Sequence, residues 1–366
     1  MKLNKLIIKY FDLIRTVIAI LIGFILSLLC IVFISDDPIR TISIYMFKPF
    51  DGIRRIGTMI EYMIPVMCTG VGMCFMLSVS KFNLIGEGAL FLAASFITFV
   101  ATQLTPNLPP VVFPIVLIVI GAVVGALCGA VPAALEAKWK TNIVVVTIML
   151  NYVLTFAGIY ILYYWMRDEK KTFVGSDAIP DAARLTSFIK RTYVHTGLFV
   201  AIGLIIFAYW FLYRTKLGYQ MRLVGKNPNF AKYSGVSVVF ITILAQCIGG
   251  AAAGIGGTIE TLGKYDRFIW LAQTGYGFDG MSLALMAKGN PLLIPVVAFV
   301  LAYIRIGADI VGQTTDVPLE FVQVIQSIII MLVAAGSFLS SYRQKAIVKV
   351  AKQEELLKAA ARSTLK

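Results

Sequence analysis

The stretch from Arg214 to Gly235, RTKLGYQMRLVGKNPNFAKYSG, is polar and basic in a chain that is otherwise mostly apolar. It contains five Lys and Arg residues and no Asp or Glu. Long hydrophobic segments flank it on both sides, so we expect a loop that projects from a membrane domain, and its positive charge indicates the cytoplasmic side. The alternative is a solvated connecting loop that only follows the charge rule, and this stretch alone does not decide between the two.

Within this stretch, apolar residues recur at helical spacing. Leu217, Met221 and Val224 share one face, and a turn is expected over residues 225–228. The pattern predicts a short amphipathic helix parallel to the membrane, followed by a second helical turn over residues 230–233.

The composition sets the protein class. Of 366 residues, 59% are hydrophobic and 14% are charged, whereas soluble domains carry about 25% charged residues. We therefore expect an integral membrane protein. The net charge of +14 does not indicate nucleic-acid binding, because the Lys and Arg residues lie in loops and tails and not on one face. The five cysteines all lie in apolar segments without a CxxC or Cys/His cluster, so no disulfide framework, zinc site or other cofactor is predicted.

The hydrophobic pattern predicts an all-α, polytopic protein, because a spanning helix needs about 20 mostly apolar residues. About ten segments qualify: 14–34, 56–80, 89–103, 111–135, 143–166, 196–213, 236–259, 261–289, 292–310 and 321–341. The segment 261–289 is rich in glycine and only partly apolar, so we expect it to be broken. The apolar run that begins the chain has no small-residue cleavage site, which favours an uncleaved first helix.

The distribution of Lys and Arg places both termini in the cytoplasm. The predicted organisation is a membrane domain over residues 1–341, with halves at about 14–213 and 236–341 joined by the basic stretch 214–235. A basic cytoplasmic tail follows over residues 342–366.

Two glycine-containing breaks interrupt the apolar pattern. Phe82 to Gly88 reads FNLIGEG, and Gly275 to Gly280 reads GYGFDG. An ionisable residue in a membrane segment costs about 2.5–3.5 kcal/mol, so Glu87 is expected to face a cavity or a partner. Gly-interrupted segments at corresponding places in two halves point to internal repeats around a central pathway. The alternative is that Glu87 and Asp279 cap helix N-termini near a surface.

Glycines four residues apart suggest close helix packing. They occur at 121, 125 and 129 in the fourth segment and at 250 and 254 in the seventh, and small residues at this spacing let helices approach closely in lipid. We favour packing over a moving helix pair.

Isolated polar residues give weaker signals. Arg305 and Asp309 are four residues apart, which favours an ion pair within one helix. His195, the only histidine, is expected to be an ordinary surface group. Glu87 alone does not indicate proton coupling, because the sequence shows no chain of carboxylates or histidines.

Motifs for catalysis are not found. The sequence contains no nucleophile elbow, metal motif or Walker phosphate loop, and the nearest approach, residues 257–264, has the wrong glycine spacing. We therefore expect a transport subunit and not a membrane-embedded enzyme. Energy for active transport would come from another subunit or, in the alternative, from an ion gradient that drives a secondary transporter of a small polar solute.

Four patches carry a resemblance to a known family: residues 82–95 (FNLIGEGALFLAAS), 141–152 (TNIVVVTIMLNY), 217–236 (LGYQMRLVGKNPNFAKYSGV) and 275–292 (GYGFDGMSLALMAKGNPL). In this order they resemble the branched-chain amino acid/simple sugar type of ABC importer permease, most closely its nucleoside-type members. The resemblance implies about ten helices in two related halves in a bacterial cell membrane. It also implies cytoplasmic ATP-binding subunits, a second and related permease subunit, and an extracellular solute-binding lipoprotein as partners.

The resemblance also suggests roles for particular residues. Those expected to line the substrate pathway are Phe82, Asn83, Glu87, Asn151, Phe278 and Asp279. Those expected to couple the membrane domain to the ATPase are Arg222, Gly225, Asn227, Pro228, Ala231 and Gly235, with Gly225 in a turn and Ala231 leaving room for the ATPase. Purine or pyrimidine nucleosides are the leading substrates, and ribose-like sugars and riboflavin-like ligands remain open.

Overall fold

The computed structural model describes residues 25, 32, 35–103, 109–168, 172–189 and 191–315. The chain divides into two units, residues 49–306 and residues 1–48 with 307–366. The predicted spans 14–34 and 321–341 lie, apart from two residues, outside the described residues, and so does the tail 342–366.

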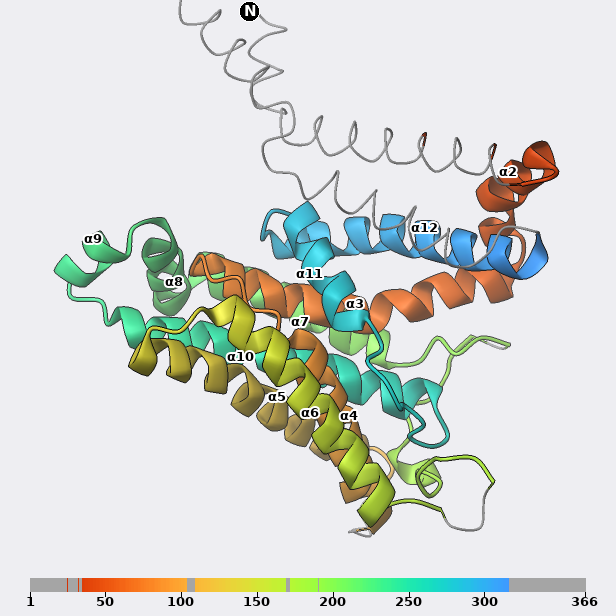
Figure 1. The fold of residues 1–366 in the computed structure, drawn as a ribbon, viewed down its shortest axis with the longest axis horizontal. Coiled ribbons are helices and arrows are strands. Elements are labelled where there is room, and N and C mark those ends of the chain that lie inside the picture. Colours follow the sequence, from red (N-terminus) through yellow and green to blue (C-terminus); the bar gives the residue numbers. More distant parts are fainter. Residues whose placement is uncertain are drawn as a thin grey trace, which may run out of the picture. The chain divides into compact units, whose positions relative to one another are not determined.

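The described residues are helical apart from connecting loops and two isolated β-bridges (Figure 1). The α-helices are α2 (Pro38–Phe47), α3 (Ile53–Ser78), α4 (Gly86–Gln103), α5 (Val112–Trp139), α6 (Ile143–Trp165), α7 (Gly197–Arg214), α8 (Lys216–Lys226), α9 (Pro228–Tyr233), α10 (Val238–Lys264), α11 (Tyr276–Met286) and α12 (Ile294–Thr314). Short 3₁₀ turns lie at Lys48–Phe50, Asp181–Ala183 and Pro291–Leu293.

Seven of the described helices are long and apolar enough to cross a membrane: α3, α4, α5, α6, α7, α10 and α12 with its preceding turn. Each coincides with a predicted span to within a few residues. The expected break in the segment 261–289 is also confirmed, because α10 ends at Lys264 and α11 has only 11 residues. The total of about ten spans, the two related halves and the cytoplasmic termini stay predictions.

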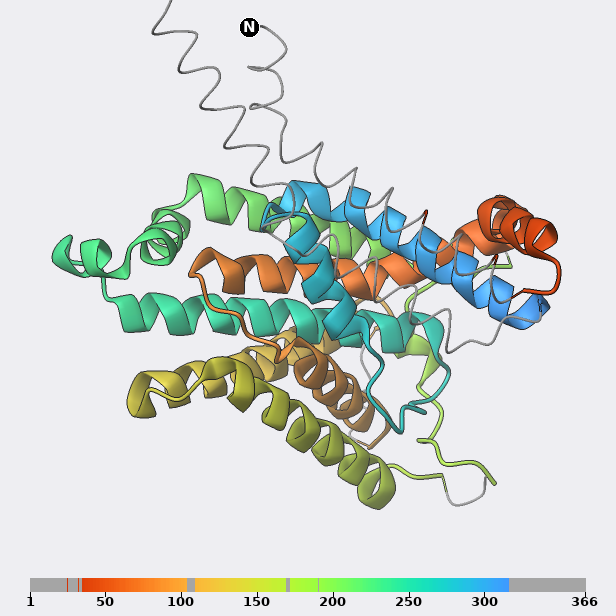
Figure 2. The ribbon, with the colours of Figure 1, turned by 45° about the horizontal axis from the view of Figure 1, so that its top comes forward.

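Helix α10 is central to the unit of residues 49–306. It packs against α3, α4 and α5, and both ribbon views show it running alongside α3 on one side and α5 on the other (Figures 1 and 2). Helices α8 and α9 project beyond the end of α7 and the start of α10 in both views. The basic stretch is therefore a separate helical projection.

Glycines make the close contact between α5 and α10. The backbone oxygen of Gly250 would lie 2.3 Å from a Cβ at Gly125, and that of Gln246 would lie 2.2 Å from a Cβ at Gly129. In the other direction, the oxygen of Gly121 would lie 2.2 Å from a Cβ at Gly254. The two predicted glycine stripes thus face each other across antiparallel helices. No side chain larger than hydrogen fits at this contact without a backbone shift.

The polar insert after α6 folds back over the end of α10. Ile179 and Ala183 pack with Leu262 in one apolar cluster, and Arg267 forms an ion pair with Asp168 at 2.6 Å. The insert is thus an ordered cover over the α10–α11 connection in the part that the structure describes.

His195, at the end of this insert, is buried, so the prediction of a surface group is wrong. Its Nδ1 accepts a hydrogen bond from the N–H of Gly197 at 3.2 Å, and its ring lies where a side chain at Gly263 would be. Burial, together with the positive charge of Lys264, lowers the pKa of His195 from 6.5 to about 4. Sequence patterns did not reveal this burial, because Gly263, which makes room for the ring, is distant from His195 in the chain.

The glycine contact predicts the effect of a larger residue. We expect Gly125→Val to lower the free energy of unfolding by about 1–3 kcal/mol or more, because it forces α5 away from α10. Thermal unfolding of the protein in mild detergent measures this. Gly203→Val on α7 is the matched control, since a Cβ at Gly203 meets nothing within 4 Å. Equal stability of the two variants would contradict the close packing.

The lowered pKa of His195 predicts a pH dependence of stability. The unfolded chain takes up a proton near pH 6.5, whereas the folded chain does so only near pH 4. The free energy of unfolding should therefore fall by about 3 kcal/mol as the pH is lowered through this window. His195→Asn, which keeps an acceptor but does not titrate, should remove much of this slope. An unchanged slope in the variant would show that other groups cause it.

Candidate functional site

The break between α3 and α4 is held by side chains of α6. The backbone N–H of Leu84 donates to Thr147 Oγ1 at 3.2 Å, and Asn151 Nδ2 donates to the Leu84 carbonyl at 2.8 Å. Asn151 Oδ1 accepts a hydrogen bond from the N–H of Gly88 at 2.9 Å. Unpaired backbone groups cost several kcal/mol in lipid, so Asn151 stabilises the non-helical backbone at this point.

Asn83 holds the same break from the other side. Its Oδ1 accepts from the N–H of Ile85 at 2.8 Å, and its Nδ2 donates to Gln246 Oε1 on α10 at 2.7 Å. The side chain is buried. Asn83 thereby links the loop to the central helix.

Glu87, in the first turn of α4, caps a different helix. Its carboxylate accepts from the N–H of Gly275 at 2.7 Å, from the N–H of Gly277 at 2.6 Å and from the hydroxyl of Thr274 at 3.0 Å. These groups form the N-terminus of α11, where Gly275 has a left-handed φ of 85° that favours glycine. Glu87 is fully buried.

Helices α4 and α11 therefore meet N-terminus to N-terminus. A Cβ at Gly277 would lie 2.3 Å from the backbone nitrogen of Glu87. Both helices direct the positive end of their dipole toward this junction, where a buried carboxylate is stabilising. The capping interpretation of Glu87 is confirmed in part. The carboxylate caps the N-terminus of α11, but Glu87 itself belongs to α4 and is buried within the protein and not near a surface.

Asp279 has a different role from Glu87. It accepts hydrogen bonds from Tyr62 on α3 and Arg305 on α12, and it forms an ion pair with Arg305. Arg305 also donates to the Tyr62 hydroxyl at 3.0 Å and lies over its ring. The four-residue spacing pointed to Asp309 as the partner of Arg305. It did not reveal the contact of Arg305 with Asp279, which links α12 to α11.

A second buried charge cluster lies close to α11. Lys264 forms ion pairs with Glu61 at 2.6 Å and with Glu260 at 3.7 Å, and the Tyr276 hydroxyl donates to Glu260 at 3.2 Å. Both carboxylates are buried. The sequence alone did not indicate this cluster of carboxylates. Only the four-residue spacing of Glu260 and Lys264 could have suggested one of its ion pairs.

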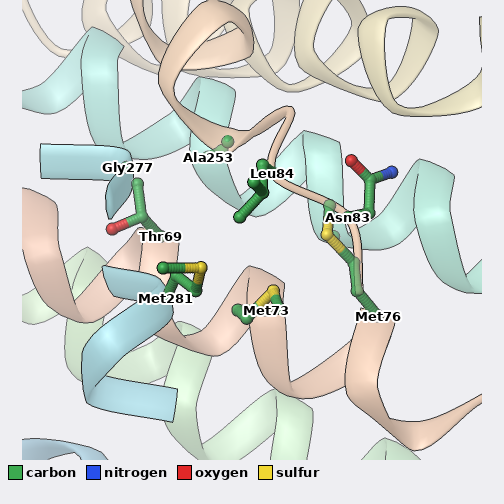
Figure 3. A pocket seen from close by; sticks show the side chains of 10 residues that line it. Thr69, Met73, Met76, Asn83, Leu84, Ala253, Gly277 and Met281 are labelled. Atoms are coloured by element: carbon green, nitrogen blue, oxygen red, sulfur yellow. The ribbon is translucent and has the colours of Figure 1, made fainter. Parts of the chain in front are cut away.

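A small cavity lies beside the α4–α11 junction, with Leu84 and three methionines around it (Figure 3). Its volume is about 10 Å³, which is room for about one water molecule. Helix α3 contributes Thr69, Met73 and Met76 to the lining. These residues are four and three positions apart, and this helical spacing could have predicted that they share one face of α3. The cavity is too small for a sugar in this conformation.

The predicted pathway residues fall into three groups. Asn83 lines the cavity. Glu87, Asn151 and Asp279 are buried and engaged in the hydrogen bonds described above. Phe82 is half-buried and Phe278 is 36% exposed, and neither contributes to the cavity lining. Contact of these residues with a substrate stays a prediction.

The basic stretch forms the two helices that its pattern predicts. Thr215 accepts from the N–H of Gly218 at 3.1 Å and caps α8, and Asn227 accepts from the N–H of Phe230 at 3.0 Å and caps α9. Pro228 occupies the first position of α9, where it needs no N–H partner. These caps explain why the chain turns between α8 and α9.

One expectation for this stretch is wrong, because Gly225 lies outside the turn, and burial distinguishes its other residues from one another. Met221 and Val224 are buried, but Leu217 is 37% exposed and does not share their environment. Gly225 lies within α8 and not in the turn, and a Cβ there would be 2.2 Å from the Ser78 carbonyl. Ala231 is buried within the chain, so its exposed neighbours form the surface of α9.

Comparison with known proteins places these elements in a family. Residues 56–334 match the model of the branched-chain amino acid transport system permease component. A nucleoside ABC transporter permease protein, NupB, of Lactococcus lactis is 28% identical over 87% of this chain and 89% of its own. A guanosine permease protein, NupP, of Bacillus subtilis is 27% identical over 78% and 83%. A glucose permease protein, TsgB13, of Haloferax volcanii is 26% identical over 86% and 84%. No solved structure matches the chain.

The capping by Glu87 predicts a graded loss of stability. We expect Glu87→Ala to lower the free energy of unfolding by about 3 kcal/mol or more, because it leaves buried N–H groups without an acceptor. Glu87→Gln keeps one acceptor oxygen and should cost less. Hydrogen exchange at Gly275 and Gly277, measured by mass spectrometry of the α11 peptide, should rise in the same order.

A control separates this effect from general damage to the fold. Helix α5 takes no part in the hydrogen bonds of Glu87. In the Glu87→Gln variant, hydrogen exchange in α5 should therefore stay at the level of the unaltered protein. Unchanged exchange at the start of α11 in Glu87→Ala would contradict the capping role.

Proposed function

Because the chain belongs to the branched-chain amino acid transport system permease component family, we propose that it forms the translocation pathway for a nucleoside or a related simple sugar. It is a multi-pass membrane protein of the cell membrane and a permease subunit of an ABC importer, without catalysis of its own. The observation that carries the proposal is the family match over residues 56–334 together with two relatives that are named for nucleoside or guanosine transport. The relative named for glucose keeps a simple sugar open.

The junction of α4 and α11 is our proposed centre of the pathway. Non-helical backbone at membrane depth is tolerated where it lies within protein or lines a cavity, and here a cavity with polar and methionine side chains adjoins the break. Methionine side chains adapt to different shapes. A cavity that holds about one water would thus be the closed state, and separation of α3 and α10 from the junction would open it.

In the open state, Asn83 would be the first polar group available to a ribose or a base. Asn83 is one of the residues that line the cavity, and its amide is bound to Gln246 of α10, so movement of α10 would release the amide. Glu87, Asn151 and Asp279 would act mainly by holding the broken helices in place. Phe82 and Phe278 are proposed to stack on a nucleobase once the cavity widens.

The surface that α9 presents fits a protein partner. Phe230 is 56% exposed and Tyr233 is 91% exposed, while Ala231 between them is buried. Exposed aromatic side chains on a capped helix are typical anchors of an interface. We propose that α8 and α9 face the cytoplasm and dock into an ATP-binding subunit, with Arg222 and Gly225 fixing α8 to the membrane domain, Asn227 and Pro228 setting the turn, and Gly235 ending α9.

The remaining partners follow from the same assignment. An importer of this class would need two ATP-binding subunits, a second permease that is a related chain, and an extracellular binding lipoprotein. An ion-coupled transporter would need none of these, and membership in this permease family disfavours it.

Uptake by the assembled importer tests the function. Proteoliposomes that contain the permease pair, the ATP-binding subunits and the binding protein should accumulate labelled nucleosides only with ATP inside. Labelled glucose and ribose serve as the competing substrates. ATP-independent uptake driven by a sodium or proton gradient would support the alternative and overturn the proposal.

The α9 surface predicts an uncoupled variant. The double change Phe230→Ala and Tyr233→Ala should leave the fold intact, because both side chains are exposed, but lower substrate-stimulated ATP hydrolysis by about fivefold or more. Phe156→Ala is the control, since Phe156 is 66% exposed on the candidate span α6. Equal ATP hydrolysis in all variants would mean that α9 is only a solvated connection.

A further inference from the structure

A second and larger cavity lies where α8 meets the end of α3. Its volume is about 240 Å³, compared with about 30 Å³ for one water molecule in the liquid. Leu77 and Leu212 form apolar walls, and Arg222 and Lys288 bring two positive charges. No Asp or Glu is among the described residues that line it.

Arg222 has an incomplete set of hydrogen bonds in this cavity. Its guanidinium group stacks over the ring of Tyr213, with 4.9 Å from Cζ to the ring centroid. Its Nε is buried and has no hydrogen-bond partner among the described residues. A buried donor of this kind is rare in proteins and indicates an acceptor from water or from a ligand.

Backbone contacts fix the elements that carry the two cations. Gly225 packs against the Ser78 carbonyl, and the Ser80 hydroxyl donates to the Gly225 carbonyl at 2.7 Å. On the opposite side, Lys288 follows α11 in a left-handed turn with φ of 54°, and its N–H donates to the Leu285 carbonyl at 3.1 Å. The two cations therefore come from elements that are fixed separately, one on α8 and one after α11.

We propose that this cavity binds a phosphate group, supplied by an anionic lipid headgroup or by a free phosphate ion. The planar fork of an arginine fits phosphate oxygens in a bidentate manner, and a lysine adds a point charge. The lipid source agrees with the leucine walls and with the position of the cavity at the ends of two candidate membrane spans, α3 and α7, where basic groups attract anionic headgroups.

The bound phosphate would join two elements of the proposed mechanism. Arg222 belongs to α8, which carries the proposed docking surface, and Lys288 follows α11, whose other end is capped by Glu87. A phosphate that contacts both Arg222 and Lys288 would tie α8 to α11. This consequence rests on the proposed function, whereas the binding site itself does not.

Binding to the purified full-length chain tests the site. The protein is stripped of lipid in an uncharged detergent and titrated in separate arms with phosphatidylglycerol, with phosphatidylcholine and with inorganic phosphate against chloride at equal ionic strength. Native mass spectrometry and thermal shift report binding. Preference for phosphatidylglycerol without a phosphate effect identifies the lipid source, and a saturable phosphate effect identifies the free ion.

Charge-matched variants locate the site. Arg222→Gln and Lys288→Gln should each weaken binding about tenfold or more, and Arg222→Lys should restore part of the loss. Lys226→Gln removes one charge from an exposed position on the same helix and should bind as the unaltered protein does. Monodisperse elution of each variant shows that it is folded.

Two results would overturn the proposal. One is that neither phosphatidylglycerol nor phosphate binds more tightly than its control, in which case the cavity holds water only. The other is an equal loss of binding in all Gln variants, which would mean general surface charge. Because neither partner subunits nor substrate are present, both results are independent of the uptake experiment.

Discussion

A single buried carboxylate that serves as acceptor for another helix is the constraint on which the rest of this structure depends. A helix that begins inside a membrane has N–H groups that water cannot reach. Glu87 of α4 accepts from two such groups of α11, and Asn151 of α6 accepts from one at the start of α4. Hydrogen bonds of these polar side chains thus position three helices at the junction of α4 and α11, and Gly277 allows the close approach of the two helix ends.

The short helix α11 is the element that extends from this junction to the basic stretch. It begins at the Glu87 carboxylate, is held in its first turn by Asp279 with Tyr62 and Arg305, and ends at the turn of Lys288, which lines the same cavity as Arg222 of α8. With the proposed phosphate bound between Arg222 and Lys288, a movement of α8 would be transmitted along α11 to the small cavity at the junction. In the proposed mechanism, α11 would thus couple α8 to the junction. The close glycine contact of α5 and α10 would stay unchanged during this movement.

Hydrophobic length and capping residues were sufficient to predict the seven described candidate spans and helices α8 and α9, but not α2 and not which helix lies beside which. The spans, the break after Lys264 and the turn at Asn227–Pro228 follow from local rules, because each depends on neighbours in the chain. The ion pairs of Glu61 with Lys264 and of Asp279 with Arg305 depend on which helix lies beside which, and periodicity carries no such information. The burial of His195 escaped prediction for the same reason, and so did the close packing of Gly225.

Accessibility of the closed cavity during transport tests the central claim most directly. Met73 on α3 lines the cavity and is buried, so Met73→Cys in a chain without other cysteines reports on its opening. We expect a membrane-impermeant thiol reagent to label this position only when the assembled importer hydrolyses ATP, and a nucleoside to slow the labelling. Met59→Cys, buried on the same helix but outside the cavity lining, should stay unlabelled. Labelling of neither position in any state of the cycle would contradict a pathway at the α4–α11 junction.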